Sequence, residues 1–156
     1  MTADLEPGAK APAFALPADD GSEVSLKAFK GRNLVLYFYP RADTPGCTRE
    51  AIDFTRLRPA FAKANTAILG VSADAIETQN RFKSKHRLKI ALASDQTHSA
   101  LKAYGAWGEK SMYGRKFMGV FRKTVLIDAQ GRIVRVWPKV SVPGHAEEVL
   151  AAAKAI

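Results

Sequence analysis

The fold is decided around one stretch, Tyr37-Phe-Tyr-Pro-Arg-Ala-Asp-Thr-Pro-Gly-Cys-Thr-Arg-Glu50, which holds the only cysteine of the chain. The unbroken apolar run Leu34–Phe38 leads into it and is typical of a strand buried on both faces. Thr44-Pro45 then predicts a helix start, because threonine favours the N-cap and proline the first helical position. This register places Cys47 in the first helical turn, where unpaired N–H groups and the positive end of the helix dipole favour a thiolate.

Strands and helices alternate along the chain on both sides of this stretch. Strand, helix, strand, helix is the βαβ rhythm of a parallel sheet, and 156 residues suffice for one domain, expected to span 1–156. The predicted elements are a short hairpin-like edge of Phe14–Pro17 and Glu23–Leu26, strand 34–38, a helix to about 64, strand 66–72, helix 75–86, strand 90–93, helix 99–104, a long loop 105–119, a hairpin of 122–128 and 132–137, and a helix from His145.

Two motifs carry a family resemblance. Tyr39-Pro40, Thr44-Pro45-Gly46-Cys47-Thr48 and Glu50 resemble the active-site segment of the peroxiredoxins, most closely of the bacterioferritin-comigratory or Q-type branch. The stretch Gly119–Asp128 is similar to the one that carries the catalytic arginine of that branch, here Arg122. The resemblance runs from about Pro7 to the C-terminus. It implies a thioredoxin-like α/β fold, a central mixed sheet flanked by helices, and a thiol-dependent peroxidase that reduces hydrogen peroxide and organic hydroperoxides.

A fast peroxidase needs more than an ionised thiol. Full ionisation of an ordinary thiol at pH 7 would raise the rate roughly 30-fold. A thiolate with a lowered pKa is a weaker nucleophile, however, and this lowers the rate again by roughly tenfold. The remainder must come from stabilising negative charge on the departing oxygen. The resemblance implies that the residues at and around Cys47 supply this. The implied catalytic residues are Cys47, Thr44, Arg122 and Pro40, and the implied substrate-binding residues are Gly46, Tyr39 and Glu50.

The resemblance implies a role for most of these residues, and several of them also have a simpler alternative. Arg122 is the expected cation that holds both the thiolate and a peroxide oxygen, or else an ordinary arginine at a strand end. The Thr44 hydroxyl contacts the peroxide or caps the helix, and Pro40 shields the sulfur or ends the strand. The N–H groups of Gly46 and Cys47 complete the cradle. Glu50 orients Arg122, or is an exposed first-turn glutamate.

The chain departs from many Q-type members because it lacks a second, resolving cysteine. The two positions where such a cysteine occurs are Ile52 and Lys83 here. A Cys47 sulfenic acid must therefore be resolved by an external thiol, left open between thioredoxin, glutaredoxin and glutathione. A disulfide between two Cys47 residues of different chains also stays open. A monomer or weak dimer is expected.

Two other functions are alternatives to this interpretation. A thiol–disulfide oxidoreductase on the same fold would normally use a Cys-x-x-Cys pair, which is absent. A basic, non-enzymatic binding module with a structural Cys47 would use the net charge of +9. The simpler explanation of the positive charge around Arg81–Lys89, a solvated helix end, is favoured. No nucleic-acid-binding motif accompanies this charge, so no nucleic-acid partner is expected.

Several further absences shape the expectations. His86, His98 and His145 lack ligand spacing and are predicted to lie on the surface, so no metal site and no cofactor are expected. No run approaches the apolar length of a membrane span, and the acidic N-terminus lacks a secretory signal. A lone cysteine fits a reducing compartment. A cytoplasmic location without membrane contact is therefore predicted.

Overall fold

A five-stranded mixed sheet forms the centre of the computed structural model, which describes residues 5–156. Its strand order is β5-β4-β3-β8-β9. β3 pairs with β4 in parallel and with β8 antiparallel. The strands are β3 (Asn33–Phe38), β4 (Thr66–Ser72), β5 (Ala91–Ser94), β8 (Lys123–Ile127) and β9 (Ile133–Trp137).

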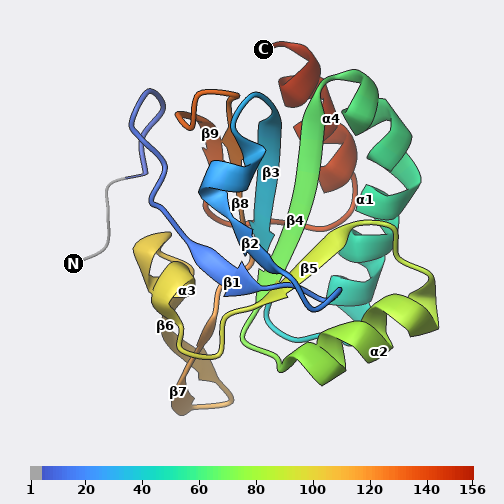
Figure 1. The fold of residues 1–156 in the computed structure, drawn as a ribbon. Helices are drawn as coiled ribbons and strands as arrows, with labels where there is room; N and C mark the ends of the chain where they lie inside the picture. Colours follow the sequence, from blue (N-terminus) through green and yellow to red (C-terminus); the bar gives the residue numbers. More distant parts are fainter. Residues whose placement is uncertain (1–4) are drawn as a thin grey trace.

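Helices cover one face of this sheet and smaller elements cover the other (Figure 1). The three long helices α1 (Pro45–Lys63), α2 (Ile76–His86) and α4 (His145–Lys154) contribute to the first core. The second core includes residues of α3 (Ser99–Ala103) and the antiparallel pair β1 (Ala15–Pro17) and β2 (Glu23–Ser25), which is followed by the 3-10 helix η1 (Leu26–Phe29). This arrangement confirms the expected α/β class, including the N-terminal hairpin-like edge.

The central strand shows why its sequence is apolar throughout. Successive side chains of a strand point to opposite faces, so Val35 and Tyr37 enter the core under α1, while Leu34, Leu36 and Phe38 enter the core on the opposite face. All six residues of β3 are buried. The strand is therefore a fixed platform, and the loop after it carries the cysteine.

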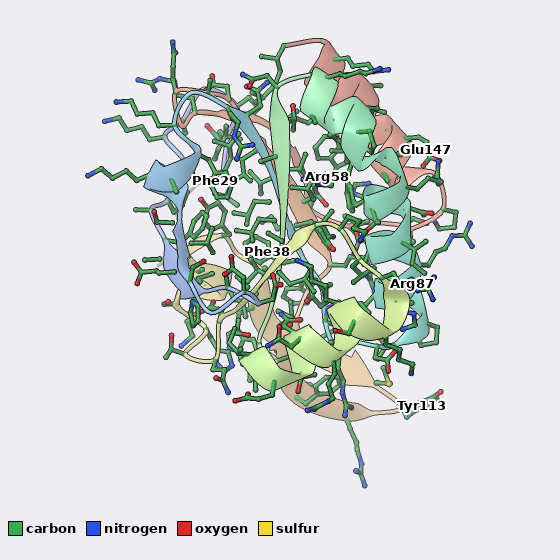
Figure 2. The ribbon with its side chains drawn as sticks, turned by 45° about the vertical axis from the view of Figure 1, so that its right-hand side comes forward. Phe29, Phe38, Arg58, Arg87, Tyr113 and Glu147 are labelled. Carbon is green, nitrogen blue, oxygen red and sulfur yellow. The ribbon has the colours of Figure 1, made fainter. Side chains whose placement is uncertain are left out.

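Residues 105–119 are not a loop, and that prediction was wrong. They hold β6 (Trp107–Met112) and β7 (Arg115–Val120), an antiparallel pair outside the main sheet. The turn Tyr113-Gly114 has positive φ at both residues, as a two-residue hairpin loop of type I′ requires. Figure 2 shows Tyr113 at the tip of this hairpin, and its side chain is 97% exposed.

Two further features of the fold bear on function. β8 lies beside β3 with Lys123 opposite Phe38, so the residue before Lys123 reaches the end of β3 where the cysteine loop begins. Among the helices of residues 5–156, none combines the length and the apolar character that a membrane crossing needs.

Candidate active site

Cys47 lies in the first turn of α1, as predicted, and its side chain is only 1% exposed. Pro45 is the first residue of the helix and Thr44 occupies the N-cap position with extended backbone angles. The Thr44 side chain does not cap the helix, however. Its hydroxyl donates instead to the carbonyl of Arg41 at 2.7 Å. The capping role expected for the Thr44 side chain is therefore wrong, and its hydroxyl hydrogen is used by Arg41.

Arg122 reaches Cys47 across 75 residues of sequence. It lies in the link between β7 and β8, and its Nη2 donates to the Cys47 sulfur at 3.3 Å. Its Nη1 donates to Glu50 Oε1 at 2.8 Å. One planar guanidinium thus joins two residues of α1 that are three positions apart, and an arginine fork suits such a double contact.

Gly46 makes room for this guanidinium. A Cβ atom built on Gly46 would lie 3.1 Å from Arg122 Nη2, which is tighter than ordinary van der Waals contact. The helix geometry also leaves the N–H groups of Gly46 and Cys47 without an intrahelical acceptor. Thr48 is the first residue of α1 whose N–H reaches back, to the carbonyl of Thr44 at 2.9 Å.

Glu50 is a buried partner of Arg122, so the alternative that it is an exposed glutamate was wrong. Its side chain is 1% exposed. Burial raises the pKa of Glu50 to about 7, although the charge of Arg122 and its hydrogen bond oppose the rise. Its second oxygen, Oε2, has no hydrogen-bond partner among residues 5–156. Burial works to lower the pKa of Arg122, but Glu50 and Cys47 more than offset this and raise it, so the guanidinium stays charged.

Tyr39 and Pro40 flank the site in different ways. Pro40 is half-buried in the loop that leads to Cys47. The Tyr39 ring is buried, and its hydroxyl donates to Gln79 of α2. The Tyr39 hydroxyl is thus engaged with Gln79, and a part for Tyr39 in substrate binding stays a prediction.

Sequence reasoning missed a polar network that connects α2 and the end of β4 to the backbone of the loop before Cys47. Gln79 is fully buried and its amide donates to Ser72 Oγ and to the carbonyl of Ala93. Ser72 donates to Asp74, whose carboxylate accepts the backbone N–H of Ala42 at 2.8 Å. The helical spacing of Gln79 and Phe82, both buried, was the available signal.

Tyr37 is a further residue near the site that sequence reasoning missed. Its ring stacks on Phe54 of α1 with ring centroids 4.8 Å apart. A Cβ atom on Gly70 of β4 would lie 2.7 Å from this ring, so glycine is required there. The Tyr37 hydroxyl is buried without a partner among the described residues, and burial raises the pKa of Tyr37 well above its ordinary value. The phenol is therefore neutral.

The histidines differ from the expectation at one position. His145 is buried, contacts Thr124 at 2.9 Å, and has its pKa lowered to about 4 by burial, so its predicted surface position was wrong. His86 contacts Asp43 at 2.7 Å, and His98 stacks on Trp107. Residues 5–156 contain no group of three or more His, Cys, Asp or Glu side chains that could hold a metal ion.

The chain is similar to known proteins over nearly its whole length. Residues 7–136 match the AhpC/TSA family. Peroxiredoxin Bcp of Bacillus subtilis is 43% identical over 146 residues, which cover 94% of this chain and 93% of that protein. A structure of the bacterioferritin comigratory protein of Xanthomonas campestris, described for its alkyl peroxide reduction activity, has a TM-score of 0.89 and 41% identity, covering 98% of each chain. Structures of peroxiredoxin Q from that organism include two different Cys-to-Ser mutants. That protein therefore has at least two cysteines, whereas this chain has one.

Proposed function

This chain belongs to the AhpC/TSA family and is a thiol peroxidase, and we propose that Cys47 is the sulfur that its peroxide oxidises. The observation that carries the proposal is the contact of 3.3 Å between Arg122 Nη2 and the Cys47 sulfur. Cys47 is also the only thiol in the sequence.

The first half of the reaction oxidises the sulfur. The Cys47 thiolate attacks one peroxide oxygen, the S–O bond forms as the O–O bond breaks, and the electron pair leaves on the other oxygen. That oxygen takes up a proton and departs as water or an alcohol, which leaves Cys47 as a sulfenic acid. Sulfur loses two electrons and the peroxide gains them.

Arg122 stabilises the charge that moves during this step. Its fork allows one N–H to hold the sulfur while the remaining donors face the departing oxygen. Glu50 accepts from the other arm at 2.8 Å and fixes the plane of the guanidinium. Glu50 is therefore a positioning residue in this proposal rather than a direct substrate contact.

The remaining predicted residues form the wall around the peroxide. The N–H groups of Gly46 and Cys47 are free to donate to an oxygen beside the sulfur. The Thr44 oxygen, whose hydrogen is directed to Arg41, accepts from the O–H of the peroxide. Pro40 presents no N–H and limits the approach of water. Hydrogen peroxide and organic hydroperoxides both fit this role assignment, since each supplies an O–O bond and one O–H group.

The second half of the reaction restores the thiol with an external reductant. One external thiol attacks the sulfenic sulfur, releases water and forms a mixed disulfide, and a second thiol then releases Cys47. No internal thiol can do this, because Cys47 is the only cysteine of the sequence. The position on α2 where many Q-type members carry a resolving cysteine holds Lys83, which pairs with Asp19 at 2.9 Å. The candidate reductants are thioredoxin, glutaredoxin and glutathione, all of which suit a cytoplasmic enzyme.

A Cys47–Cys47 link between two chains is disfavoured in this proposal. Both sulfurs would have to leave sites that are 1% exposed and approach to bonding distance. The expected state is a monomer or weak dimer. Size-exclusion chromatography of the reduced and the peroxide-treated protein measures the oligomeric state. Denaturing electrophoresis without reductant then detects a disulfide-linked dimer, which would survive denaturation.

The decisive experiment combines rapid mixing with intact mass. Reduced protein mixed with hydrogen peroxide should lose its thiol and gain one oxygen, and Cys47→Ser should gain none. Arg122→Ala should slow the gain by 100-fold or more. Arg49→Ala is the matched control, because Arg49 lies on the same turn of α1 but is 69% exposed and pairs with Asp53. Thiol loss no faster than that of free cysteine would overturn the proposal.

Coupled assays then identify the reductant. Turnover with thioredoxin and its reductase is compared with turnover on glutathione and glutaredoxin at equal peroxide concentration. Replacing hydrogen peroxide with cumene hydroperoxide in the same assays measures the preference for organic substrates.

A further inference from the structure

A cleft of about 370 Å³ opens at the end of the sheet opposite to Cys47. Its floor includes Leu34, at the start of β3, and Ile127, at the end of β8. Its walls are the segment 10–14, η1 and the turn between β8 and β9. These three segments gather at the same end of the ribbon in Figure 1. The volume lies in the range of small-molecule sites.

Backbone hydrogen bonds hold these walls in place. The N–H of Ala11 donates to the carbonyl of Gly131 at 2.9 Å, and the N–H of Gly31 donates to the carbonyl of Ala129 at 2.9 Å. The guanidinium of Arg132 donates to the carbonyl of Gly8 at 3.0 Å. The N-terminal segment is thus fastened across the β8–β9 turn, and the cleft is a preformed feature of the fold.

The cleft combines an apolar interior with a strongly cationic rim. Leu26 and Phe29, both partly exposed, and Phe14 supply its apolar surface, and Leu34 and Ile127 lie almost fully buried beneath them. The cations that line it are Lys10, Lys27, Lys30, Arg32 and Arg132. Figure 2 shows nitrogen-tipped side chains extending into solvent around Phe29, which lies on η1.

The positive charge of the rim is not neutralised within the described residues. None of these five cations forms an ion pair in residues 5–156. Asp128 is the one acid of the lining. Its Oδ1 already accepts the backbone N–H groups of Gln130 and Arg132, at 2.9 and 3.0 Å. The rim therefore has free donors for an anion.

We propose that this cleft binds an amphipathic carboxylate, a hydrocarbon chain with one anionic headgroup. The chain lies against the apolar floor, where each buried methylene contributes to binding. The carboxylate lies among the cations of the rim, where arginine and lysine donate charge-assisted hydrogen bonds. The site lies at the other end of the sheet from Cys47 and does not depend on the peroxidase proposal.

Calorimetric titration of the full chain with sodium decanoate, kept below its micelle concentration, tests the proposal. Saturable binding of one decanoate per chain is expected. Acetate, which has the charge without the chain, and decanol, which has the chain without the charge, should bind at least tenfold more weakly. Shorter carboxylates should lose roughly tenfold for every two methylenes removed.

Two variants locate the ligand. Ala13→Trp fills the cleft from an exposed wall position and should abolish binding while the rate of Cys47 oxidation is unchanged. Lys27→Glu with Lys30→Glu should weaken binding at least tenfold. Lys139→Glu with Lys154→Glu makes the same change of net charge at two lysines that do not line the cleft, and it should alter binding by less than about threefold.

Four outcomes would overturn the inference. If decanol bound as tightly as decanoate, the positive charge of the rim would have no role in binding. If the control pair Lys139→Glu with Lys154→Glu weakened binding as much as the rim pair, the attraction would come from the net charge of the protein and not from the cleft. Undiminished binding in Ala13→Trp would place the ligand elsewhere. Cosedimentation with phosphatidylglycerol vesicles without any decanoate binding would show that the cationic face meets a membrane surface instead.

Discussion

Replacing Arg122 with lysine separates the charge of the guanidinium from its shape. In the structure Nη1 contacts Glu50 at 2.8 Å and Nη2 contacts the Cys47 sulfur at 3.3 Å. A lysine ammonium keeps the positive charge but is a single point donor. It can stay with Glu50 or turn to the sulfur, and it lacks the second arm that faces the departing oxygen.

The size of the effect follows from these contacts. A full charge 3.3 Å from the sulfur attracts a thiolate by about 5 kcal/mol at an effective dielectric constant of about 20. That attraction stabilises the thiolate before the reaction and weakens as the charge leaves the sulfur, so it does not by itself raise the rate of the chemical step. The lost donor to the departing oxygen is worth about 3 kcal/mol in comparable oxyanion sites, which is roughly a 100-fold decrease in rate.

The assay is the second-order rate constant of Cys47 oxidation, followed by stopped flow and checked by intact mass. Arg122→Lys is expected to be about 100-fold slower than the wild type, and Arg122→Ala slower still. The alanine variant also leaves Glu50 buried without its partner, so urea unfolding must accompany it, with an expected loss of about 3 kcal/mol of stability. The lysine variant should lose less stability because a cation remains beside Glu50.

Arg49→Lys is the control for arginine replacement in general. Arg49 is on the same helical turn and mostly exposed, so its rate should stay within about twofold of the wild type. An Arg122→Lys rate within threefold of the wild type would refute the reasoning, because it would mean that the forked geometry does not contribute to breaking the O–O bond.

Three further predictions concern groups around the site. Burial raises the pKa of Glu50 from an ordinary 4.5 to about 7, so the folded protein keeps a proton that the unfolded chain has lost, and the free energy of unfolding should fall as pH rises from about 4.5 to 7. Urea unfolding of Glu50→Gln and wild type across this range should yield a difference that grows with pH; a difference independent of pH would contradict the shift. Gly46→Ala should raise helix stability by up to about 1 kcal/mol yet slow Cys47 oxidation at least tenfold, because the new Cβ would lie 3.1 Å from Arg122 Nη2; stopped flow with an unchanged rate would show that the guanidinium yields freely. Tyr37→Phe should raise the free energy of unfolding by about 1 kcal/mol, because the buried hydroxyl has no partner in the described residues, and lower stability on denaturation would reveal a contact that this structure lacks.

The cysteine helix was predictable because its signals are local. Proline at the first position, threonine before it and the apolar strand upstream all fix the register within a dozen residues. The approach of Arg122 to Cys47 is not local. It depends on β8 pairing antiparallel with β3, which no periodicity in the chain specifies, and only the family resemblance pointed to it.

The spacing of buried residues could have prevented one error, at His145, and could have decided between the two alternatives for Glu50. His145 was predicted on the surface, although it lies four residues before Val149 and eight before Ala153, on the same buried face of α4. Glu50 likewise precedes Phe54 by one helical turn on the buried face of α1. A charged or titratable residue at such a position indicates a buried partner, and here the partner is Arg122.

The hairpin β6–β7 could not be found from hydrophobic pattern. Most residues of both strands are at least partly exposed, so there is no alternation of buried and exposed positions along them. Met112, Phe117 and Met118 are exposed, and the two strands are held mainly by their own pairing. Only the Tyr113-Gly114 turn carried a hairpin signal.

The enclosure of the sulfur is expected to affect the two halves of the proposed catalytic cycle differently. A peroxide is small enough to pass the half-buried Arg122, whereas a thiol borne by another protein must bring its own sulfur to within about 2 Å of Cys47. With Cys47 only 1% exposed, we expect regeneration by a protein thiol to require a local movement around the sulfur. The burial of one sulfur is therefore expected to set the pace at which a protein thiol can recycle this chain.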